Sequence, residues 1–334
     1  MPDQLTLILL VVLALAVLFD YINGFHDTAN AIATSVSTRA LKPEHAILMS
    51  ATANFVGALT GTAVAKTIAS GLATTPDGAA GQTIVAAALV GAILWNLLTW
   101  RLGIPSSSSH ALIGGLLGAV IASVGVEAIK LEGVRDKVLL PLVLSPVLGI
   151  AIGFMLMVVL LNVFQHAHPQ RLNERFRRLQ VLSAAYMAFS HGSNDAQKTM
   201  GIMTLALFTA GVIPNQEIPL WVILLAASAI SLGTAAGGWR IIRTMGQRVV
   251  KLDPVHGFAA ETTAASIIFT ASHLGMPVST THVISSAIIG VGSSDRLSAV
   301  RWGVAGNIVI AWILTIPASA LAAALAFIVL DLFI

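Results

Sequence analysis

Residues 102–110 read LGIPSSSSH, and residues 274–282 read LGMPVSTTH. Five of these nine positions are identical, and two more exchange serine for threonine. At the same separation of 172 residues, the tripeptide Gly-Thr-Ala recurs at 61–63 and 233–235. Internal symmetry of this kind indicates a duplicated unit. We therefore predict a first inverted repeat at 1–164, a basic cytoplasmic linker at 165–180 and a second inverted repeat at 181–334.

The composition places both repeats in a membrane. Of the 334 residues, 56% are hydrophobic and only 10% are charged, whereas a soluble domain carries about 25% charged residues. Ten apolar runs can be delimited, several of them about 20 residues long, which matches a bilayer core. Aromatic content is low and short alternating strands are missing, so helices are favoured over a β-barrel. We predict an all-α integral membrane protein with about 10 to 12 membrane segments, and we exclude a soluble enzyme.

Polar residues interrupt some of these runs. The first run (4–38) and the sixth run (181–212) are longer than a bilayer requires, and their polar residues predict broken helices. Two other runs open on Pro105 and Pro277, each followed by serines or threonines. Such starts are typical of re-entrant hairpins, in which non-helical backbone is buried at membrane depth.

Basic residues orient the chain, because cytoplasmic loops carry an excess of lysine and arginine. Placing the linker 165–180 and the loop 239–254 inside puts 13 of the 18 basic residues on the cytoplasmic side. The basic cytoplasmic loops then account for the sequence pI of about 9.5. No nucleic-acid partner is needed to explain it. Each repeat holds five runs, an odd number, so the second repeat must enter the membrane inverted. Both termini are predicted on the outer face of a multi-pass cell-membrane protein.

Two aspartates occupy equivalent positions in the repeats, because the segment 24–27 (GFHD) aligns with 192–195 (GSND) after a shift of four residues. A charged group inside a bilayer is costly and indicates function, although a helix cap or a structural partner is the alternative. Carboxylate and amide oxygens near helix breaks are typical of cation or proton sites. Lys198 is interpreted as an ion-pair partner three residues after Asp195. The other buried candidates are Asp27, Glu261, Asp20 and Lys66, and nearby polar groups are His26, Asn30, Asn194 and Gln197.

The serine and threonine clusters follow the two prolines and open apolar, glycine-rich helices. Helix N-termini offer free N–H donors and about half a positive charge, which suits an anion. We predict that the two tips meet near the midplane around one tetrahedral oxyanion; N-capping without a ligand is the alternative. The histidines that follow could relay protons or only hydrogen-bond across helices. The hydroxyls are those of Ser107, Ser108, Ser109, Ser279, Thr280 and Thr281, and the histidines are His110 and His282.

Three functions remain open on these residues. An ion-coupled transporter fits inverted repeats with a site near the midplane, and a passive anion channel on the same fold would gain nothing from buried carboxylates. An intramembrane hydrolase built on Ser109 and His110, or on Thr281 and His282, is disfavoured, because adjacent helical residues do not face each other and no third orienting group is apparent. Phosphate keeps a proton near neutral pH and can donate it in a hydrogen bond to a carboxylate. It is therefore favoured over sulfate.

Four ordered segments resemble the inorganic phosphate transporter (Pit/PiT) family, most closely its bacterial low-affinity members. They are 24–31 (GFHDTANA), 105–111 (PSSSSHA), 190–198 (SHGSNDAQK) and 277–283 (PVSTTHV). The resemblance implies a secondary active symporter that moves inorganic phosphate into the cell with a coupling cation by alternating access, and it implies a homodimer. A sulfate or other oxyanion permease of the same fold is the alternative.

The resemblance also distributes roles over individual residues. It implies phosphate binding by the two hydroxyl clusters with Asn30 and Gln197, and a sodium ion, if one is used, at Asp27, Asn30 and Asp195. Sodium-coupled animal relatives carry a glutamate in each half, but here Asn54 stands at the first of these positions, so protons are favoured over sodium. No cofactor is expected, and phosphate travels alone or as a neutral metal–phosphate complex. The residues implied in coupling are Asp27, Asp195, Asn194, Glu261, His26 and Asn54.

Overall fold

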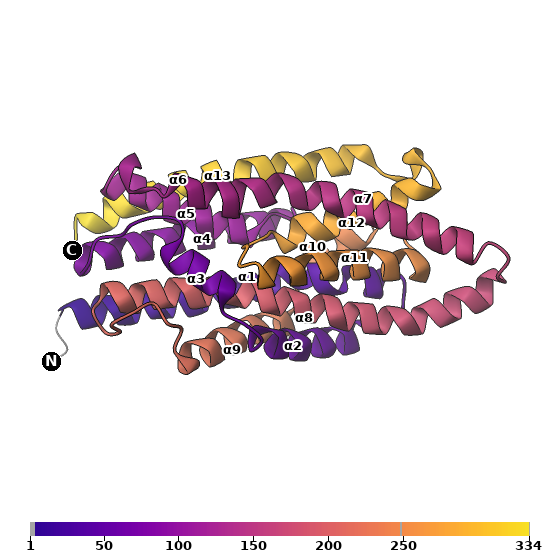
Figure 1. The fold of residues 1–334 in the computed structure, drawn as a ribbon, viewed down its shortest axis with the longest axis horizontal. Coiled ribbons are helices and arrows are strands. Elements are labelled where there is room, and N and C mark those ends of the chain that lie inside the picture. The colour runs from indigo at the N-terminus through magenta and orange to yellow at the C-terminus, as the bar shows by residue number, and fades with distance from the viewer. Residues whose placement is uncertain (1–3, 248, 334) are drawn as a thin grey trace.

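The computed structural model describes residues 4–247 and 249–333, and within them the chain is helical apart from loops and one isolated bridge. Long helices run along the longest axis of the molecule, and α1 begins at the end where α13 finishes (Figure 1). Arg248, a basic residue of the loop 239–254, lies outside the described residues. The α-helices are α1 (Gln4–Ser37), α2 (Pro43–Ala58), α3 (Ala63–Ser70), α4 (Ala79–Leu102), α5 (Ser108–Ser123), α6 (Leu131–Val134), α7 (Leu140–Val163), α8 (Pro169–Thr209), α9 (Leu220–Ala236), α10 (Trp239–Gln247), α11 (Pro254–His273), α12 (Thr280–Asp295) and α13 (Trp302–Asp331).

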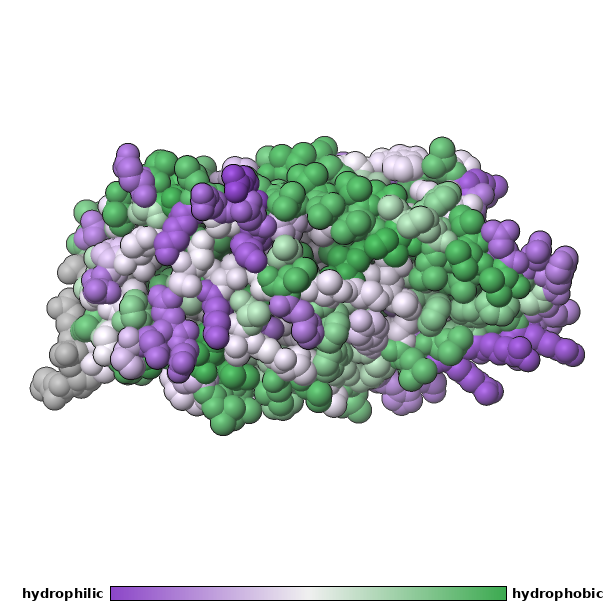
Figure 2. Space-filling view, in the orientation of Figure 1, coloured by the Kyte–Doolittle hydropathy of each residue, from purple (hydrophilic) through white to green (hydrophobic). Residues whose placement is uncertain are grey.

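The described residues include four stretches that are long and apolar enough to cross a membrane: α1, α4, the run Leu131–Val163 and α13. Two bent pairs, α2 with α3 and α9 with α10, turn by 69° and 76°, and they raise the number to six if each pair is one span. Apolar side chains cover much of the middle of the visible face, and hydrophilic side chains gather towards its two ends (Figure 2). The prediction of an all-helical membrane protein is confirmed, whereas the number of membrane segments stays a prediction.

The predicted positions of the broken helices are wrong. Helices α1 and α8 continue without interruption through Asp27 and Asp195, and the breaks lie between α2 and α3 and between α9 and α10. The predicted linker is also largely helical, because α8 begins at Pro169 and carries the arginines of the linker on its first turns. Proline suits the first turn of a helix, where an N–H group would have no partner in the helix.

Glycines at two helix crossings explain why the glycine-containing segments of α1 and α8 do not break. Helix α1 crosses α9 at Gly24 and Gly233, and α2 crosses α8 at Gly57 and Gly192. A Cβ atom added to any of these four glycines would lie 2.0 to 2.3 Å from a backbone oxygen of the facing helix. These distances are far below van der Waals contact, so only glycine permits the two close approaches.

The apolar core consists of two clusters, and α1 and α8 contribute to both. The first cluster takes α1 residues up to Ile22 and α8 residues from Ala196 onward, together with α4 and α5. The second takes α1 residues from Ala29 and α8 residues up to Ala188, together with α11 and α12. The middle sections of α1 and α8, which carry the two aspartates, therefore lie between the clusters.

The α2–α8 crossing gives a first prediction. Gly192→Ala should destabilise the protein by about 1–3 kcal/mol, because the added methyl group meets the backbone of α2 and forces the helices apart. Gly306→Ala is the matched control, since nothing lies within 4 Å of a Cβ at this position on α13. Thermal unfolding of the detergent-solubilised protein measures both. Equal midpoints for the two variants would contradict the close crossing.

Candidate functional site

Two short helices, α5 and α12, point their N-termini at each other in the middle of the molecule. Each is 16 residues long, about 24 Å, and therefore shorter than a bilayer core of about 30 Å. Ser107 and Ser279 cap them, accepting hydrogen bonds from the backbone N–H groups of His110 (3.1 Å) and His282 (3.2 Å). The rings of His110 and His282 meet edge to face with centroids 4.7 Å apart. Capping thus accounts for two of the six predicted hydroxyls.

Lys198 ties the two helix tips to the buried aspartate of α8. Its ammonium donates to the Asp195 carboxylate, to the Ser109 hydroxyl in the first turn of α5, and to the carbonyl of Val278 at 3.0 Å. Ser109 also donates to the same Val278 carbonyl at 3.2 Å. The hydroxyl of Thr280, in the first turn of α12, donates to the second oxygen of Asp195 at 3.1 Å. One charged network therefore joins α8 to both tips.

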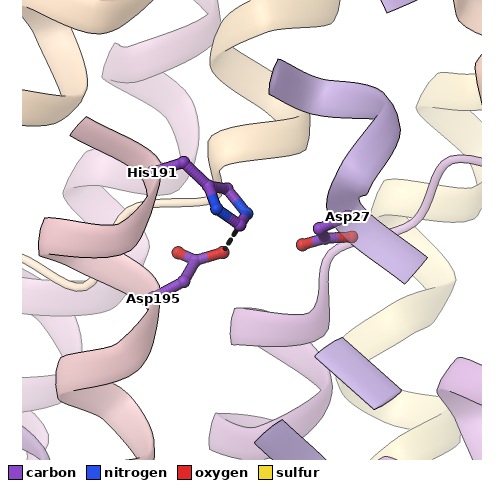
Figure 3. Close-up of side chains that lie close together, drawn as sticks. All are labelled: Asp27, His191 and Asp195. Atoms are coloured by element: carbon purple, nitrogen blue, oxygen red, sulfur yellow. Dashed lines mark ion pairs between the residues drawn. The ribbon is translucent and has the colours of Figure 1, made fainter. Parts of the chain in front are cut away.

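The two predicted aspartates come together with a histidine that was not predicted. Asp27, His191 and Asp195 each offer one ligand atom, and these atoms lie within 4.8 Å of one another; Figure 3 shows Asp27 facing the other two. His191 Nε2 lies 3.1 Å from Asp195 Oδ2, and its Nδ1 lies 3.0 Å from the amide oxygen of Asn54. His26 pairs with its neighbour Asp27 at 2.5 Å. An imidazole with two carboxylates can hold a proton or a transition metal more readily than a hard cation.

The side-chain amides of Asn30 and Gln197, both predicted to bind phosphate, lie at different helix ends. Asn30 reaches the tip of α12, where its Nδ2 donates to Thr281 at 2.9 Å and to Thr280 at 3.2 Å. Gln197 instead accepts a hydrogen bond from the backbone N–H of Val64 at 2.8 Å. Because the first N–H groups of a helix lack partners within the helix, Gln197 completes the N-terminus of α3. The structure therefore brings Asn30 to the hydroxyl clusters and engages the carbonyl of Gln197 elsewhere.

Glu261 forms a second buried polar centre, built from three helices. Its Oε1 accepts from Thr34 on α1 at 2.5 Å and from Gln180 at 3.2 Å, and its Oε2 accepts from Ser183 at 2.5 Å. No basic side chain is among these donors. Asn54, the other residue implied by the glutamate pattern, lies on α2 and donates to Thr234 at 2.9 Å. Glu261 and Asn54 thus belong to different clusters.

Several buried polar atoms near the tips have no hydrogen-bond partner among the described residues. They include the hydroxyl of Ser108, Nδ1 of His110 and both ring nitrogens of His282. Asn194 donates through Nδ2 to Ser272 at 2.9 Å, while its Oδ1 is without a partner in the described part of the chain. Unsatisfied buried polar groups cost free energy. A polar ligand between the tips could form hydrogen bonds with these atoms.

Sequence reasoning missed His191 as a site residue and understated Lys198. A signal was present, because His191 lies four residues before Asp195 and Lys198 three residues after it, which puts all three on one face of a helix. No comparable signal existed for the residues around Glu261, since they come from helices far apart in the sequence. Of the buried candidates, Lys66 is exposed. The unpredicted partners of Glu261 are Thr34, Gln180 and Ser183.

Comparison with known proteins gives consistent matches over nearly the whole chain. The profile of the Phosphate transporter family matches residues 23–323. A "Probable low-affinity inorganic phosphate transporter" of Bacillus subtilis (strain 168) is 48% identical over 331 residues, covering 99% of each chain. The protein of the same name from Rhizobium meliloti (strain 1021) is 48% identical over 322 residues, 96% of each chain. A solved structure titled "The sodium-dependent phosphate transporter" superposes with a TM-score of 0.89 at 27% identity, covering 98% of this chain and 100% of the other.

The Lys198 network gives a second prediction. Lys198→Met should lower the free energy of unfolding by about 3–5 kcal/mol, because it leaves the buried Asp195 carboxylate without its cation. The double variant Lys198→Met with Asp195→Asn removes both charges and should recover most of that loss. Unfolding in detergent measures the cycle, and Lys66→Met, at an exposed lysine, is the control. A double variant as unstable as the single one would show that the ion pair is not the cause.

Proposed function

The chain belongs to the phosphate transporter family, and we propose that it is a secondary active symporter that carries inorganic phosphate into the cell with a coupling cation. Its relatives are transporters and not enzymes, so the hydrolase alternative is excluded. One observation carries the proposal: the N-termini of α5 and α12 converge on the Lys198 ammonium beside two buried aspartates.

The phosphate site in this proposal lies between the two helix tips. N-terminal N–H groups and hydroxyls are the donors that bind oxyanions in proteins, and the Lys198 ammonium adds the positive charge. A phosphate that retains a proton can donate it to the Asp195 carboxylate, which sulfate cannot do. Gln197 acts at a distance by fixing the start of α3. The proposed ligands are Ser107, Ser108, Ser109, Ser279, Thr280, Thr281 and Asn30.

Charge neutrality supports coupling to a cation. Four carboxylates are buried in the described residues, those of Asp20, Asp27, Asp195 and Glu261, against one buried ammonium on Lys198. An anion can enter such a region only if protons or cations neutralise part of this negative charge. The triad of two carboxylates and a histidine favours protons, while the structural neighbour is described as sodium-dependent.

Histidines give the coupling residues a route for proton exchange in this proposal. His26 pairs with Asp27, and both ring nitrogens of His282 are without a hydrogen-bond partner among the described residues. His110 and His282 lie in ring contact across the two tips. A relay through this pair would link the two half-helices during transport. Asn54 lies against His191 of the carboxylate–histidine triad, and Asn194 donates to Ser272.

Two inverted repeats at 1–164 and 181–334 are part of the proposal, and reciprocal helix packing supports them. Helix α1 packs on α9 and α8 packs on α2, while α5 packs on α13 and α12 packs on α7. Alternating access then follows from rocking of one repeat against the other, with α5 and α12 as re-entrant hairpin helices. The basic residues orient both termini outward in the cell membrane, and the homodimer stays a prediction.

Transport assays give a third prediction. In proteoliposomes, an imposed proton gradient should drive uphill uptake of labelled phosphate, and Asp27→Asn or Asp195→Asn should abolish it, because each removes a carboxylate that balances the charge of the transported ions. Asp77→Asn, the same change at an exposed position, should transport normally. Uptake unaffected by both substitutions would overturn the assigned roles, and competition by sulfate would show an oxyanion permease of broader selectivity.

A further inference from the structure

Helix α1 carries a file of buried polar residues along one face. The spacings between its members are three or four residues, which places them on one side of a helix. They extend over 18 residues, about 27 Å, close to the thickness of a bilayer core of about 30 Å. All are at most 7% exposed. The members are Asp20, Asn23, Asp27, Asn30 and Thr34 on α1, and Thr38 directly after the end of α1.

Asp20, at one end of this file, is not part of the site described above. It is fully buried, and neither of its carboxylate oxygens has a hydrogen-bond partner among the described residues. The polar side chains beside it are Asn23, one turn along α1, and Thr199 on α8. The amide oxygen of Asn23 and the hydroxyl of Thr199 are also without partners in the described part of the chain. Four unpartnered oxygens thus lie on these three neighbouring side chains.

An ionised carboxylate in this setting would be costly, because both of its oxygens are buried without a hydrogen-bond partner among the described residues. Either a cation or a proton can remove that cost. Hard divalent cations take about six to eight oxygen ligands, and the Asp20 site offers four on three side chains. A proton needs one carboxylate oxygen and one acceptor, and Asn23 Oδ1 or Thr199 Oγ1 can be that acceptor. The geometry therefore suits a proton better than a hard divalent cation.

The charged groups around Asp20 agree with this. Asp195 and Lys198 on α8 are the charged side chains that act on it, and the Lys198 ammonium is already engaged by Asp195 and the two tips. Helices α4 and α9 also pack against α1, and neither carries an acidic or basic residue between 79 and 100 or between 220 and 236. No free counter-charge therefore compensates Asp20.

We propose that Asp20 is a proton-binding site of the transporter and carries a coupling proton on its side chain, hydrogen-bonded to Asn23 or Thr199. The inference rests on the proposed symport and adds a third carboxylate to the two paired aspartates. Asp20 lies seven residues, two helical turns, before Asp27 on the same face of α1. The proton site and the phosphate site are therefore connected through one helix and through Lys198.

Transport measurements separate coupling from substrate binding. Asp20→Asn mimics the protonated carboxyl but cannot release a proton, so uptake driven by a pH gradient should fall about a hundredfold, the lower range for loss of a positioned proton-transfer group. Phosphate exchange at equal pH on both sides should fall far less, since it needs no net proton movement. Asp77→Asn is the matched control. Equal pH-driven uptake in Asp20→Asn and wild type would overturn the proposal, and so would a selective loss of sodium-driven uptake.

A spectroscopic measurement tests Asp20 even if the transport function is different. In infrared spectra of the purified protein with labelled aspartate, the band of a protonated buried carboxyl should be present in wild type and lost in Asp20→Asn. The aspartate label separates this band from that of Glu261. If Asp20→Asn does not fold, Asp20→Glu should move the intensity to the unlabelled glutamate band. A wild-type spectrum without a protonated aspartate band overturns the proton assignment regardless of the transport result.

Discussion

The contacts of the Lys198 ammonium hold together the centre of the molecule, where α8 meets the N-termini of α5 and α12. The ammonium is buried and contacts the Asp195 carboxylate, the hydroxyl of Ser109 and the carbonyl of Val278. These three groups come from α8, from the first turn of α5 and from the segment that leads into α12. In a low-dielectric interior, a cation shared in this way is a strong constraint on geometry. It holds two half-helices, separated by about half the sequence, at one point.

Much of this arrangement could be predicted from local sequence. The repeated proline–serine–histidine motif predicted the two helix tips, and the aligned aspartates predicted that Asp27 and Asp195 belong to one site. The continuity of α1 and α8 could not be predicted, because a glycine before an aspartate is compatible with a break or with a close crossing. Only the facing backbone decides between them, and at Gly24 and Gly192 it lies within contact of any added Cβ.

The cluster around Glu261 shows a different limit of sequence reasoning. Its donors Thr34, Gln180 and Ser183 are ordinary polar residues on two helices, and no spacing rule connects them to a glutamate on a third. Long-range partners of this kind depend on the register between helices, which is fixed by packing. The same holds for Gln197, whose motif position suggested a ligand and whose carbonyl completes the start of α3.

The glycine crossings have a consequence for movement. Where α9 lies on α1 and α2 lies on α8, backbone touches backbone and no side chain is interposed. Sliding or rolling at these places requires no rotamer to change, whereas interlocked side chains elsewhere resist such displacement. The helices can therefore change their crossing angle most easily at these glycines, which are Gly24 and Gly233 for one pair and Gly57 and Gly192 for the other. A tilt of either helix pair at these glycines would change the spacing of the polar groups that lie between the pairs.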